Sequence, residues 1–475
     1  MYFYTRGSSV ILVLIFSAVF LMLTTSLTGY LFAQQRLHLL KENKERALQI
    51  AEAGLDYYKW FLAHYPGDVT DGTGAPGPYV HPYTDPEGGE IGSFSLEVEG
   101  NELCNSVSAI DISSTGWSDN DPSVRRTVYG RYARPSVAEY AFILNSNVWA
   151  GEDRTIIGPY HSNGGIRMDA DNRSTVTSSV LSWQCTSTFG CSPAAQQEGI
   201  FGVGDHPELW SYPVPTIDFQ GITVDLTEMK EVAQSMGLYF NPYGAVPDRV
   251  GYHMIFKVDG TVDVYRVTNT TAIQSYRADT QQWADEYHLI SNQNFMGNYQ
   301  IPEDCPMIFA ESKVWIEGVI SRKITLASAR LSNPNVNLDI VINGNLTYAA
   351  NDGSDGLTVI GQRSILIPLV VPDSLTVQGI FIAQTGYFGR NHYTTTDGPN
   401  DVPSAYDSYV KRGTLNLTGT IVSNLREGTK WISGNTYVSG YNVRNNSYDR
   451  NLATDPPPLT PVVSNDYRFV EWQEE

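Results

Sequence analysis

The stretch "RGSSVILVLIFSAVFLMLTTSLTGYLFAQQRLHLLKENKERALQIAEAGLDYYKWF", residues 6–61, decides the fold of the first part of this chain. No charged residue occurs from Ser8 to Ala33, and about 20 apolar residues are enough to cross the hydrocarbon core of a bilayer. Beyond Ala33, charged residues alternate with apolar ones that recur every three or four positions, as in an amphipathic helix. We therefore predict one continuous helix, with a membrane span at 8–33 and a stalk at 34–63.

The composition of the remaining chain favours β-structure with many turns. Charged residues make up 17% of the 475 residues, whereas Gly (41), Tyr (29) and Pro (25) are plentiful. A chain of this length exceeds one ordinary core, so we expect two or three packed units after the helix. The formal net charge of −20 would repel the phosphate backbone of nucleic acid and anionic lipid surfaces. We therefore expect no nucleic acid partner.

The cysteines predict a small disulfide loop. Cys185 and Cys191 lie in "CTSTFGC", a spacing that suits a disulfide in an oxidising compartment, and no C-x-x-C pair typical of a zinc site is present. Two unrelated free thiols are the alternative for this pair. Cys104 and Cys305 are available for a second bridge, but the sequence does not fix their connectivity.

Residues 64–136 are predicted to form a connector and a small antiparallel sheet. The segment from His64 to Gly92 is rich in Gly, Pro and Asp, which is typical of a loop. The runs "GSFSLEVEG", "NSVSAIDISSTGWSD" and "VRRTVYGRYARPS" then alternate polar and apolar residues in the manner of half-buried strands.

The residues 137–223 and 268–475 are predicted to form a β-rich head. Short runs such as "KVWIEGVISRKITLAS", "LTVQGIFIAQTGYFG" and "LNLTGTIVS" carry β-branched side chains at alternate positions, with a Gly or Asn at the corners. This texture predicts a β-solenoid, in which each coil buries its inward face against the next. A β-sandwich is the alternative.

Residues 224–267 are predicted to form a small α+β insertion between the two parts of the head. "TVDLTEMKEVAQSMGLYF" has an amphipathic helical pattern. "YHMIFKVDGTVDVYRV" follows it, and the Asp259-Gly260 pair between alternating runs predicts a β-hairpin.

The N-terminal pattern resembles the class III signal and stalk of type IV pilin-like proteins. A short polar leader, "MYFYTRG" at 1–7, ends in a basic residue and a glycine, a hydrophobic helix follows directly, and "AEAGL" occurs at 51–55. The resemblance implies that prepilin peptidase cuts between Gly7 and Ser8, and that the partners are other pilin-like subunits and the inner-membrane assembly machinery. It also implies a single-pass precursor with the leader in the cytoplasm and the head outside, at the cell surface or the filament tip once assembled. A plain signal anchor with a helical stem is the alternative.

Two positions depart from the pattern of the major pilins in that family. Those pilins usually have an aromatic first mature residue and a glutamate at the fifth mature position, where this sequence has Ser8 and Leu12. The glutamate neutralises the N-terminal amine of a neighbouring subunit inside an apolar core, where an unpaired charge is costly. Leu12 cannot do this, so the resemblance favours a minor or tip subunit. Leu12, together with Glu52 of "AEAGL", is our candidate for a role in filament assembly.

The head offers candidates for several functions. Tyr, Asn and Asp on an exposed β-surface suit a surface glycan or protein ligand, and we expect the head to act in filament initiation, capping and adhesion. A surface-anchored enzyme that acts on polysaccharides and a signal-anchored binding protein unconnected with filaments are the alternatives. The candidate catalytic groups are His161 with Asp169 and Asp171, Asp205 with His206 and Glu208, and Arg390 with His392. No G-x-S-x-G, H-E-x-x-H or phosphate-cradling loop is present, so we do not expect an enzyme.

Two acidic turns are candidates for calcium binding. "DADN" and "NDGSDG" place Asp169, Asp171, Asp352 and Asp355 as candidate Ca²⁺ ligands, because Ca²⁺ prefers oxygen donors. Neither turn fits the twelve-residue spacing of an EF-hand. We favour ordinary acidic turns and expect no cofactor.

Overall fold

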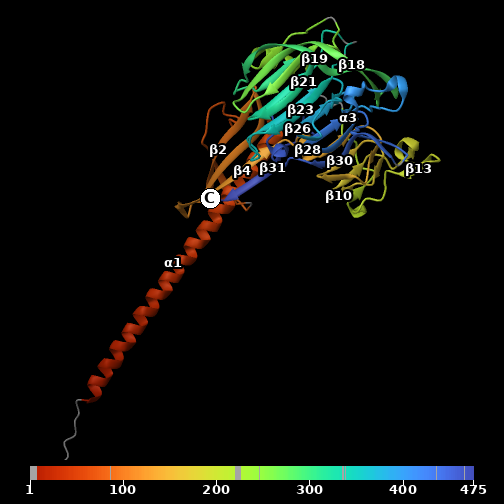
Figure 1. The fold of residues 1–475 in the computed structure, drawn as a ribbon. Coiled ribbons are helices and arrows are strands. Elements are labelled where there is room, and N and C mark those ends of the chain that lie inside the picture. Colours follow the sequence, from red (N-terminus) through yellow and green to blue (C-terminus); the bar gives the residue numbers. More distant parts are fainter. Residues whose placement is uncertain are drawn as a thin grey trace, which may run out of the picture. The chain divides into compact units, whose positions relative to one another are not determined.

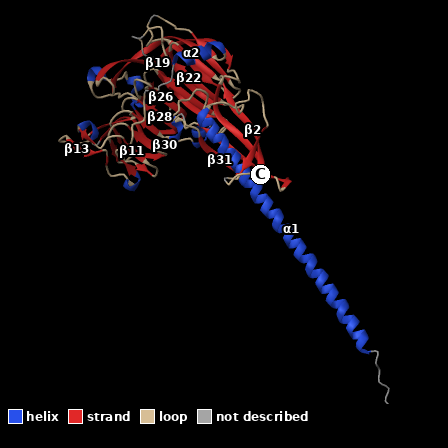
Figure 2. Ribbon diagram, turned by 180° about the vertical axis from the view of Figure 1, so that it is seen from behind, coloured by secondary structure: helices blue, strands red, loops and turns tan. Residues whose placement is uncertain are grey.

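The structure is a computed structural model that describes residues 8–85, 87–219, 226–244, 246–333, 336, 338–434, 436–464 and 466–474 (Figure 1). The chain divides into two compact units. Unit 1 takes in the described parts of Met1–Gly100, Ile110–Tyr132 and Phe469–Glu475, and unit 2 takes in those of Asn101–Ala109 and Ala133–Arg468. The predicted fold class, a long N-terminal helix followed by mainly β-structure, is confirmed (Figure 2).

Unit 1 begins with helix α1, which runs without a break from Ser8 to His64. At 1.5 Å per residue its 57 residues make a rod about 85 Å long. The large apolar side chains from Val10 to Leu40 are exposed, whereas those from Ala47 onward are mostly buried. The helix is continuous as predicted, but its side chains become buried only from Ala47, within the predicted stalk of 34–63, so the first part of that stalk is as exposed as the predicted span.

The last part of α1 packs against a five-stranded sheet in the order β1-β2-β3-β4-β31. The strands are β1 (Tyr79–Thr84), β2 (Glu90–Leu103), β3 (Ser106–Ser118), β4 (Asp121–Ala133) and β31 (Arg468–Glu474). Strands β1 and β2 pair antiparallel. The hydroxyl of Tyr132 on β4 donates a hydrogen bond to the carbonyl oxygen of Leu55 at 2.9 Å, which ties the helix to the sheet.

Small residues allow the helix and the sheet of unit 1 to approach closely. Ala47, Ala51 and Gly54 stand four and three positions apart in the chain, so they share one face of α1. A Cβ atom on Gly116 of β3 would lie 2.4 Å from the backbone nitrogen of Ala51, and one on Gly54 would lie 2.2 Å from Ser114 Oγ. The "AEAGL" stretch thus contributes small residues to the face of α1 that packs on the sheet.

The C-terminal strand lies elsewhere than predicted. The sequence pattern predicts that residues 268–475 belong to the head, but β31 joins the sheet of unit 1. The rings of Phe469 and Tyr132 pack with centres 5.1 Å apart, and Arg126 forms an ion pair with Glu474. The alternating pattern of β31 does not reveal which sheet it joins, because strand pairing depends on residues far away in the sequence.

Unit 2 is built mainly from parallel strands that stack in ladders. The longest ladder joins, in stacking order, β16 (Leu238–Phe240), β20 (Met307–Ala310), β22 (Lys323–Ser328), β24 (Gly356–Gly361), β26 (Ser374–Ala383), β28 (Lys411–Ser423), β5 (Phe142–Leu144), β8 (Tyr160–Ser162), β11 (Val176–Ser178) and β15 (Trp210–Ser211).

Two further ladders of parallel strands lie beside the longest one in the sequence of each coil. One joins β17 (Gly251–Phe256), β21 (Lys313–Ile320), β23 (Ile340–Tyr348), β25 (Ile365–Leu366) and β27 (Phe388–Gly389). The other, which we call the third ladder, joins β23, β26, β28, β30 (Thr436–Ser447), β7 (Arg154–Ile157) and β10 (Asp171–Asn172). A shorter set at one end joins β6 (Val148–Ala150), β9 (Ile166–Met168) and β14 (Ile200–Phe201).

Parallel pairing of this kind agrees with the β-solenoid, which stays a prediction. The β-sandwich that was the alternative has antiparallel pairing instead. Apolar side chains fill the inside of the stack, where for example Leu415, Leu417 and Ile421 of β28 are at most 2% exposed.

Glycines mark the corner between the third ladder and the longest ladder. Gly379 in β26, Gly419 in β28 and Gly158 between β7 and β8 all have a positive φ, of 148°, 131° and 125°. A Cβ atom on Gly419 would lie 1.9 Å from the carbonyl oxygen of Gly379, so two corners can stack only because both lack a side chain.

The remaining elements cover the stack or extend from it. Hairpin β12 (Ser182–Cys185) and β13 (Ala195–Glu198), hairpin β18 (Thr261–Arg277) and β19 (Gln282–Gln300), and β29 (Lys430–Ser433) on β30 are antiparallel. The α-helices are α2 (Leu226–Ser235), α3 (Asp407–Val410) and α4 (Arg450–Thr454). Short 3₁₀ helices lie at Val137–Glu139, Ser187–Phe189, Pro207–Leu209, Gly398–Asn400 and Ser404–Tyr406.

Within 224–267, which is predicted as an insertion between the parts of the head, the described strands are paired into the stack. Strands β16 and β17 pair in parallel with β20 and β21, so they form a coil of their own. Hairpin β18–β19, whose strands of 17 and 19 residues run well beyond the predicted boundary, packs on the stack, since Val262, Val264 and Ile273 of β18 are buried. The sequence pattern showed the helix and the turn at Asp259-Gly260, but not the long-range parallel pairing.

Candidate functional site

The exposed first half of α1 is the candidate functional site. From Ser9 onward α1 is long and apolar enough to cross a membrane, and among the described residues it is the helix of that kind. Its most apolar part is not buried in the structure. A large exposed apolar surface marks a site of interaction with a membrane or a protein. This half of α1 is therefore a candidate membrane anchor.

Polar side chains within this half are satisfied by the helix itself. The hydroxyls of Thr24, Thr25 and Thr28 donate hydrogen bonds to the carbonyl oxygens of Phe20, Leu21 and Thr24 at 2.9, 2.7 and 2.7 Å. Hydroxyl groups bonded in this way need no water, so the segment suits apolar surroundings.

Of the predicted processing and assembly residues, Ser8, Leu12 and Glu52 lie along α1. Gly7 falls outside the described residues, and Ser8 is the first residue of the helix. Leu12 is 55% exposed among other apolar side chains, and Glu52 is exposed on the part of the helix that packs against the sheet. Since 40 positions separate them, Leu12 and Glu52 stand about 60 Å apart along the helix and do not form one site.

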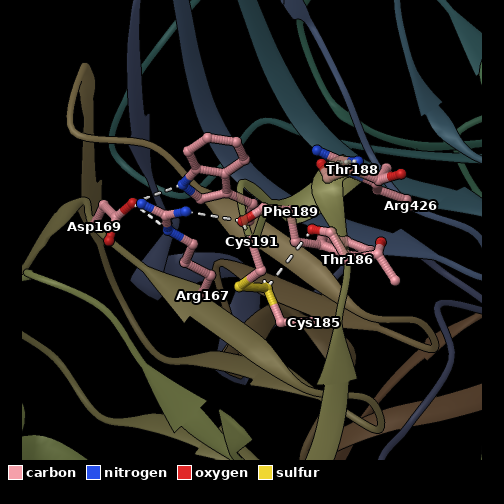
Figure 3. Close-up of a disulfide and its surroundings, with 9 residues drawn as sticks. Arg167, Asp169, Cys185, Thr186, Thr188, Phe189, Cys191 and Arg426 are labelled. Atoms are coloured by element: carbon pink, nitrogen blue, oxygen red, sulfur yellow. Dashed lines mark hydrogen bonds and ion pairs between the residues drawn. A yellow bond between two sulfur atoms is a disulfide. The ribbon is translucent and has the colours of Figure 1, made fainter. Parts of the chain in front are cut away.

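Two disulfides lie in unit 2. Cys104 in the turn between β2 and β3 is bonded to Cys305, 201 positions away, and Cys185 is bonded to Cys191. The small loop closed by the second disulfide is held from outside, because Arg426 donates a hydrogen bond to the carbonyl oxygen of Thr188 at 3.1 Å (Figure 3).

Asp169, a candidate Ca²⁺ ligand, holds this end of the stack together (Figure 3). Its Oδ2 accepts hydrogen bonds from Arg167 Nε and Trp149 Nε1, both at 2.7 Å, and its Oδ1 accepts one from the backbone nitrogen of Val203 at 3.1 Å. Arg167 in turn lies over the Trp149 ring, 4.3 Å from its centre, and donates to the carbonyl oxygen of Phe189 at 2.9 Å. Both carboxylate oxygens are thus engaged by the chain's own donors.

The other candidate Ca²⁺ ligands, Asp352 and Asp355 in one turn and Asp171 in another, are engaged by donors of the chain itself. Asp352 Oδ1 accepts hydrogen bonds from the backbone nitrogen and hydroxyl of Ser354, and Asp355 Oδ2 accepts one from the backbone nitrogen of Ala350 at 2.6 Å. Asp171 lies 3.6 Å from Arg173 Nε. Within the described part of the chain, no group of three or more His, Cys, Asp or Glu side chains is placed to hold a metal ion.

The candidate catalytic histidines make local contacts. The two ring nitrogens of His161 lie 2.9 Å from Thr177 Oγ1 and 3.0 Å from Asn163 Oδ1, so His161 stabilises the turn and does not face Asp169. Burial lowers the pKa of His161. His206 lies 2.9 Å from Glu208 Oε1 in an exposed turn next to Asp205.

Arg390 and His392, a candidate catalytic pair, contact different partners. Arg390 is fully buried, and its guanidinium donates hydrogen bonds to the carbonyl oxygens of Pro368, Leu369 and Tyr409. The ring of His392 packs on Trp431, with centres 5.5 Å apart. Arg390 thus anchors loops, and His392 belongs to an aromatic cluster.

The sequence analysis missed a buried ionic cluster under hairpin β18–β19. Glu286 accepts hydrogen bonds from the Tyr393 hydroxyl at 2.6 Å and Asn391 Nδ2 at 2.7 Å, and His288 Nδ1 lies 3.1 Å from its carboxylate. Burial raises the pKa of Glu286, but these neighbours outweigh burial and hold the pKa below its ordinary value. Nearby, burial lowers the pKa of Lys313 to about 8.

One local signal could have indicated part of this cluster. Glu286 and His288 stand two positions apart in "ADEYHL", so a strand places both on one face. The apolar Leu289 and Ile290 that follow suggest that this strand is covered. The partners Asn391 and Tyr393 lie more than a hundred positions away, and no local pattern connects them to Glu286.

The chain is similar to the crystal structure of the competence-associated pilin ComZ from Thermus thermophilus. The two share 14% sequence identity over 91% of this chain and 97% of that chain, with a TM-score of 0.28. A likeness with so low a TM-score carries no argument about this chain. No protein-family model matches the chain, and no curated protein matches it.

Proposed function

We propose that this chain is a minor or tip subunit of a type IV pilus-like filament, which displays its β-rich unit 2 outside the cell for filament initiation or capping and for adhesion. One observation carries the proposal: α1 buries its last part against its own sheet and leaves the apolar side chains from Val10 to Leu40 exposed. A helix with this division can sit in a membrane before assembly and pack against other apolar helices afterwards.

The leader pattern adds to this proposal. The basic residue and glycine that precede Ser8 resemble a prepilin peptidase site, so the mature chain would begin with the helix itself. Prepilin peptidase, other pilin-like subunits and the inner-membrane assembly machinery are the partners that this proposal names. The chain would be a single-pass precursor with the leader in the cytoplasm.

Leu12 favours a minor or tip position over a repeating one. After cleavage at Gly7 it would be the fifth residue, where a repeating pilin carries a glutamate that meets a neighbouring amine. The first acidic residue of α1 is Glu42, which is about 45 Å along the helix from Leu12 and cannot substitute for that glutamate.

The N-terminus of the mature protein tests the proposal. Mass spectrometry of the surface-sheared and membrane fractions should find a chain that begins at Ser8, N-methylated and enriched in the sheared fraction. A chain that keeps Met1 and stays in the membrane fraction would overturn filament incorporation and favour a signal-anchored binding protein. Replacement of Gly7 by Leu, which blocks cleavage in this proposal, is the matched control.

A further inference from the structure

The third ladder of unit 2 presents an uncharged polar face, and we propose that this face binds a neutral, hydroxyl-rich polysaccharide. The inference rests on the proposed function, because it names the ligand class for the adhesion role. We call the polar face the set of outward side chains on five adjacent strands, β23, β26, β28, β30 and β7, four of which can be followed side by side in Figure 1.

Strand pairing places these side chains in two rows. The first row takes one residue from each successive strand: Asn345, Thr376, Asn416, Asn445 and Thr155. Neighbouring strands of a sheet lie about 4.8 Å apart, so the row repeats a short polar group at that interval. It ends at Asp171 of β10, which pairs with Thr155.

The second row runs beside the first, two positions along each strand. It comprises Thr347, Gln378, Thr418, Ser447 and Ile157. Residues two apart on a strand are separated by about 6.6 Å, so the two rows form a regular lattice.

Burial along the strands shows that the rows face solvent. Over 415–418 of β28 the residues alternate: Leu415 and Leu417 are buried, whereas Asn416 and Thr418 are partly exposed. The same alternation holds at the row positions of β26, β23 and β7, and Asn345, Asn445 and Thr155 are exposed. The outward positions are therefore in contact with solvent.

Hydrogen bonds within the lattice hold its side chains in fixed orientations. Asn445 Nδ2 donates to Asn416 Oδ1 at 2.9 Å, and the backbone nitrogen of Thr376 donates to Asn345 Oδ1 at 2.9 Å. Each of these bonds uses one end of the side-chain amide of Asn345, Asn416 or Asn445. Both ends of the Gln378 amide are engaged, by the backbone nitrogen of Tyr348 and by Asn351 Oδ1, so Gln378 serves to order the face. Side chains that are ordered before binding lose less conformational entropy when a ligand arrives.

The charge of the face selects the ligand. Nine of the ten residues in the two rows are polar and uncharged and the tenth is Ile157, although the whole chain carries a net charge of −20. A neutral ligand can lie on the two rows without burying a charged side chain, which would be costly. An anionic or cationic polymer would find no opposite charge within the rows.

The repeat of the lattice selects a polymer. Amides and hydroxyls that both donate and accept recur at a fixed interval along five strands, and a chain of sugars offers hydroxyl groups at its own fixed interval. Many weak hydrogen bonds can then form at once, and their effect accumulates along the polymer. A folded protein surface lacks such a repeat.

Two matched variants of the full-length protein in detergent test this inference. T376E/T418E places two carboxylates in the middle of the polar face, and T280E/Q282E places two at exposed positions of hairpin β18–β19. Each is mixed with cellulose, chitin and, as an anionic probe, polygalacturonate, and the bound fraction is measured by sedimentation. Thermal unfolding of both variants checks that the fold is kept.

We expect the native protein and T280E/Q282E to bind cellulose or chitin with the same affinity. We expect T376E/T418E to bind at least about tenfold more weakly, since each carboxylate leaves hydroxyl groups of the ligand poorly matched. The inference is overturned if the native protein binds neither neutral polymer, prefers polygalacturonate, or is matched by T376E/T418E. These binding results are independent of where the mature chain begins, which is the test of the filament proposal. A chain that begins at Ser8 but does not bind would remove the glycan inference alone, and a chain that keeps Met1 but binds would remove the filament proposal alone.

Discussion

The carbonyl oxygen of Ala47 on α1 lies 2.3 Å from the position that a Cβ atom on Gly116 of β3 would occupy. Helix and sheet therefore meet backbone to backbone at this point. Backbone atoms cannot move aside as a flexible side chain can, so even one methyl group must push the helix away. We therefore expect this contact to determine how tightly α1 packs on the sheet of unit 1.

Gly116→Ala should loosen the stalk from the sheet of unit 1. We expect a loss of about 1–3 kcal/mol in the free energy of unfolding, which is typical of overpacking. Hydrogen–deuterium exchange of the backbone amides at 47–62 should become faster. Gly29→Ala is the control, because no atom lies within 4 Å of a Cβ built there and Ala favours a helix. Unchanged exchange in Gly116→Ala would show that the helix and sheet are not in close contact.

The long helix could be predicted from the sequence because its signal is local. An uncharged run, followed by apolar residues every three or four positions, is contained within α1 itself. The order of the ladders could not be predicted in this way. Ile421 pairs with Phe142, which is 421 − 142 = 279 positions away, and nothing in either strand names its partner.

The same difference between local and long-range partners decides which site residues could be predicted from the sequence. The spacing of Cys185 and Cys191 is a local pattern, whereas the partner of Cys104 lies 201 positions away. The acidic turn that contains Asp169 suggested calcium because the sequence did not show Trp149 and Arg167 beside its carboxylate. Polar residues whose partners come from other coils are the ones that sequence patterns misassign.

Removal of the Cys104–Cys305 disulfide should destabilise unit 2 more than removal of Cys185–Cys191. The first joins residues 201 positions apart and the second joins residues 6 positions apart. From loop-closure entropy, these bridges restrict the unfolded chain by about 5 and about 2 kcal/mol. We expect C104S/C305S to lose about 3 kcal/mol more than C185S/C191S in urea denaturation. Equal losses would contradict this account.

Chelation of divalent metal should leave the end of the stack around Asp169 unchanged. The Asp169 carboxylate already accepts three hydrogen bonds from Arg167, Trp149 and Val203. We expect EDTA not to shift the thermal midpoint, and Asp169→Ala to lower the free energy of unfolding by about 1–2 kcal/mol, because it leaves the partly buried donors of Arg167 and Trp149 unpaired. Asp352→Ala, in an exposed turn, is the control. A midpoint that falls with EDTA and recovers with Ca²⁺ would restore the calcium hypothesis.

Because the pKa of Lys313 is lowered, we predict that its titration makes unit 2 more stable as the pH rises above 8. Burial lowers its pKa from 10.5 to about 8, and its ammonium group donates to the carbonyl oxygens of Tyr287 and Asp248. Below pH 8 the lysine is charged in both the folded and unfolded states. Between pH 8 and 10.5 the folded state has lost the proton that the unfolded state still holds, so the free energy of unfolding rises, by up to about 3 kcal/mol.

The thermal midpoint of the native protein and of Lys313→Met, measured from pH 7.5 to 9.5, tests this prediction. The difference between the two cancels the other groups that titrate in this range. We expect the native midpoint to gain on that of the variant as the pH rises. Parallel curves would show that Lys313 keeps an ordinary pKa in the folded protein.

Leu12→Glu should reduce incorporation into filaments if the chain occupies a tip position. A glutamate at this point would place a carboxylate among apolar side chains, and a tip subunit has no preceding subunit whose N-terminal amine could pair with it. An unpaired buried charge costs several kcal/mol, so the variant should remain in the membrane fraction while the native chain is found in the sheared fraction. Leu12→Met, which conserves volume and polarity, should behave like the native protein. If Leu12→Glu instead increases the amount of chain recovered along sheared filaments, a neighbouring amine is available to it, and the chain is a repeating subunit in which Leu12 merely weakens assembly.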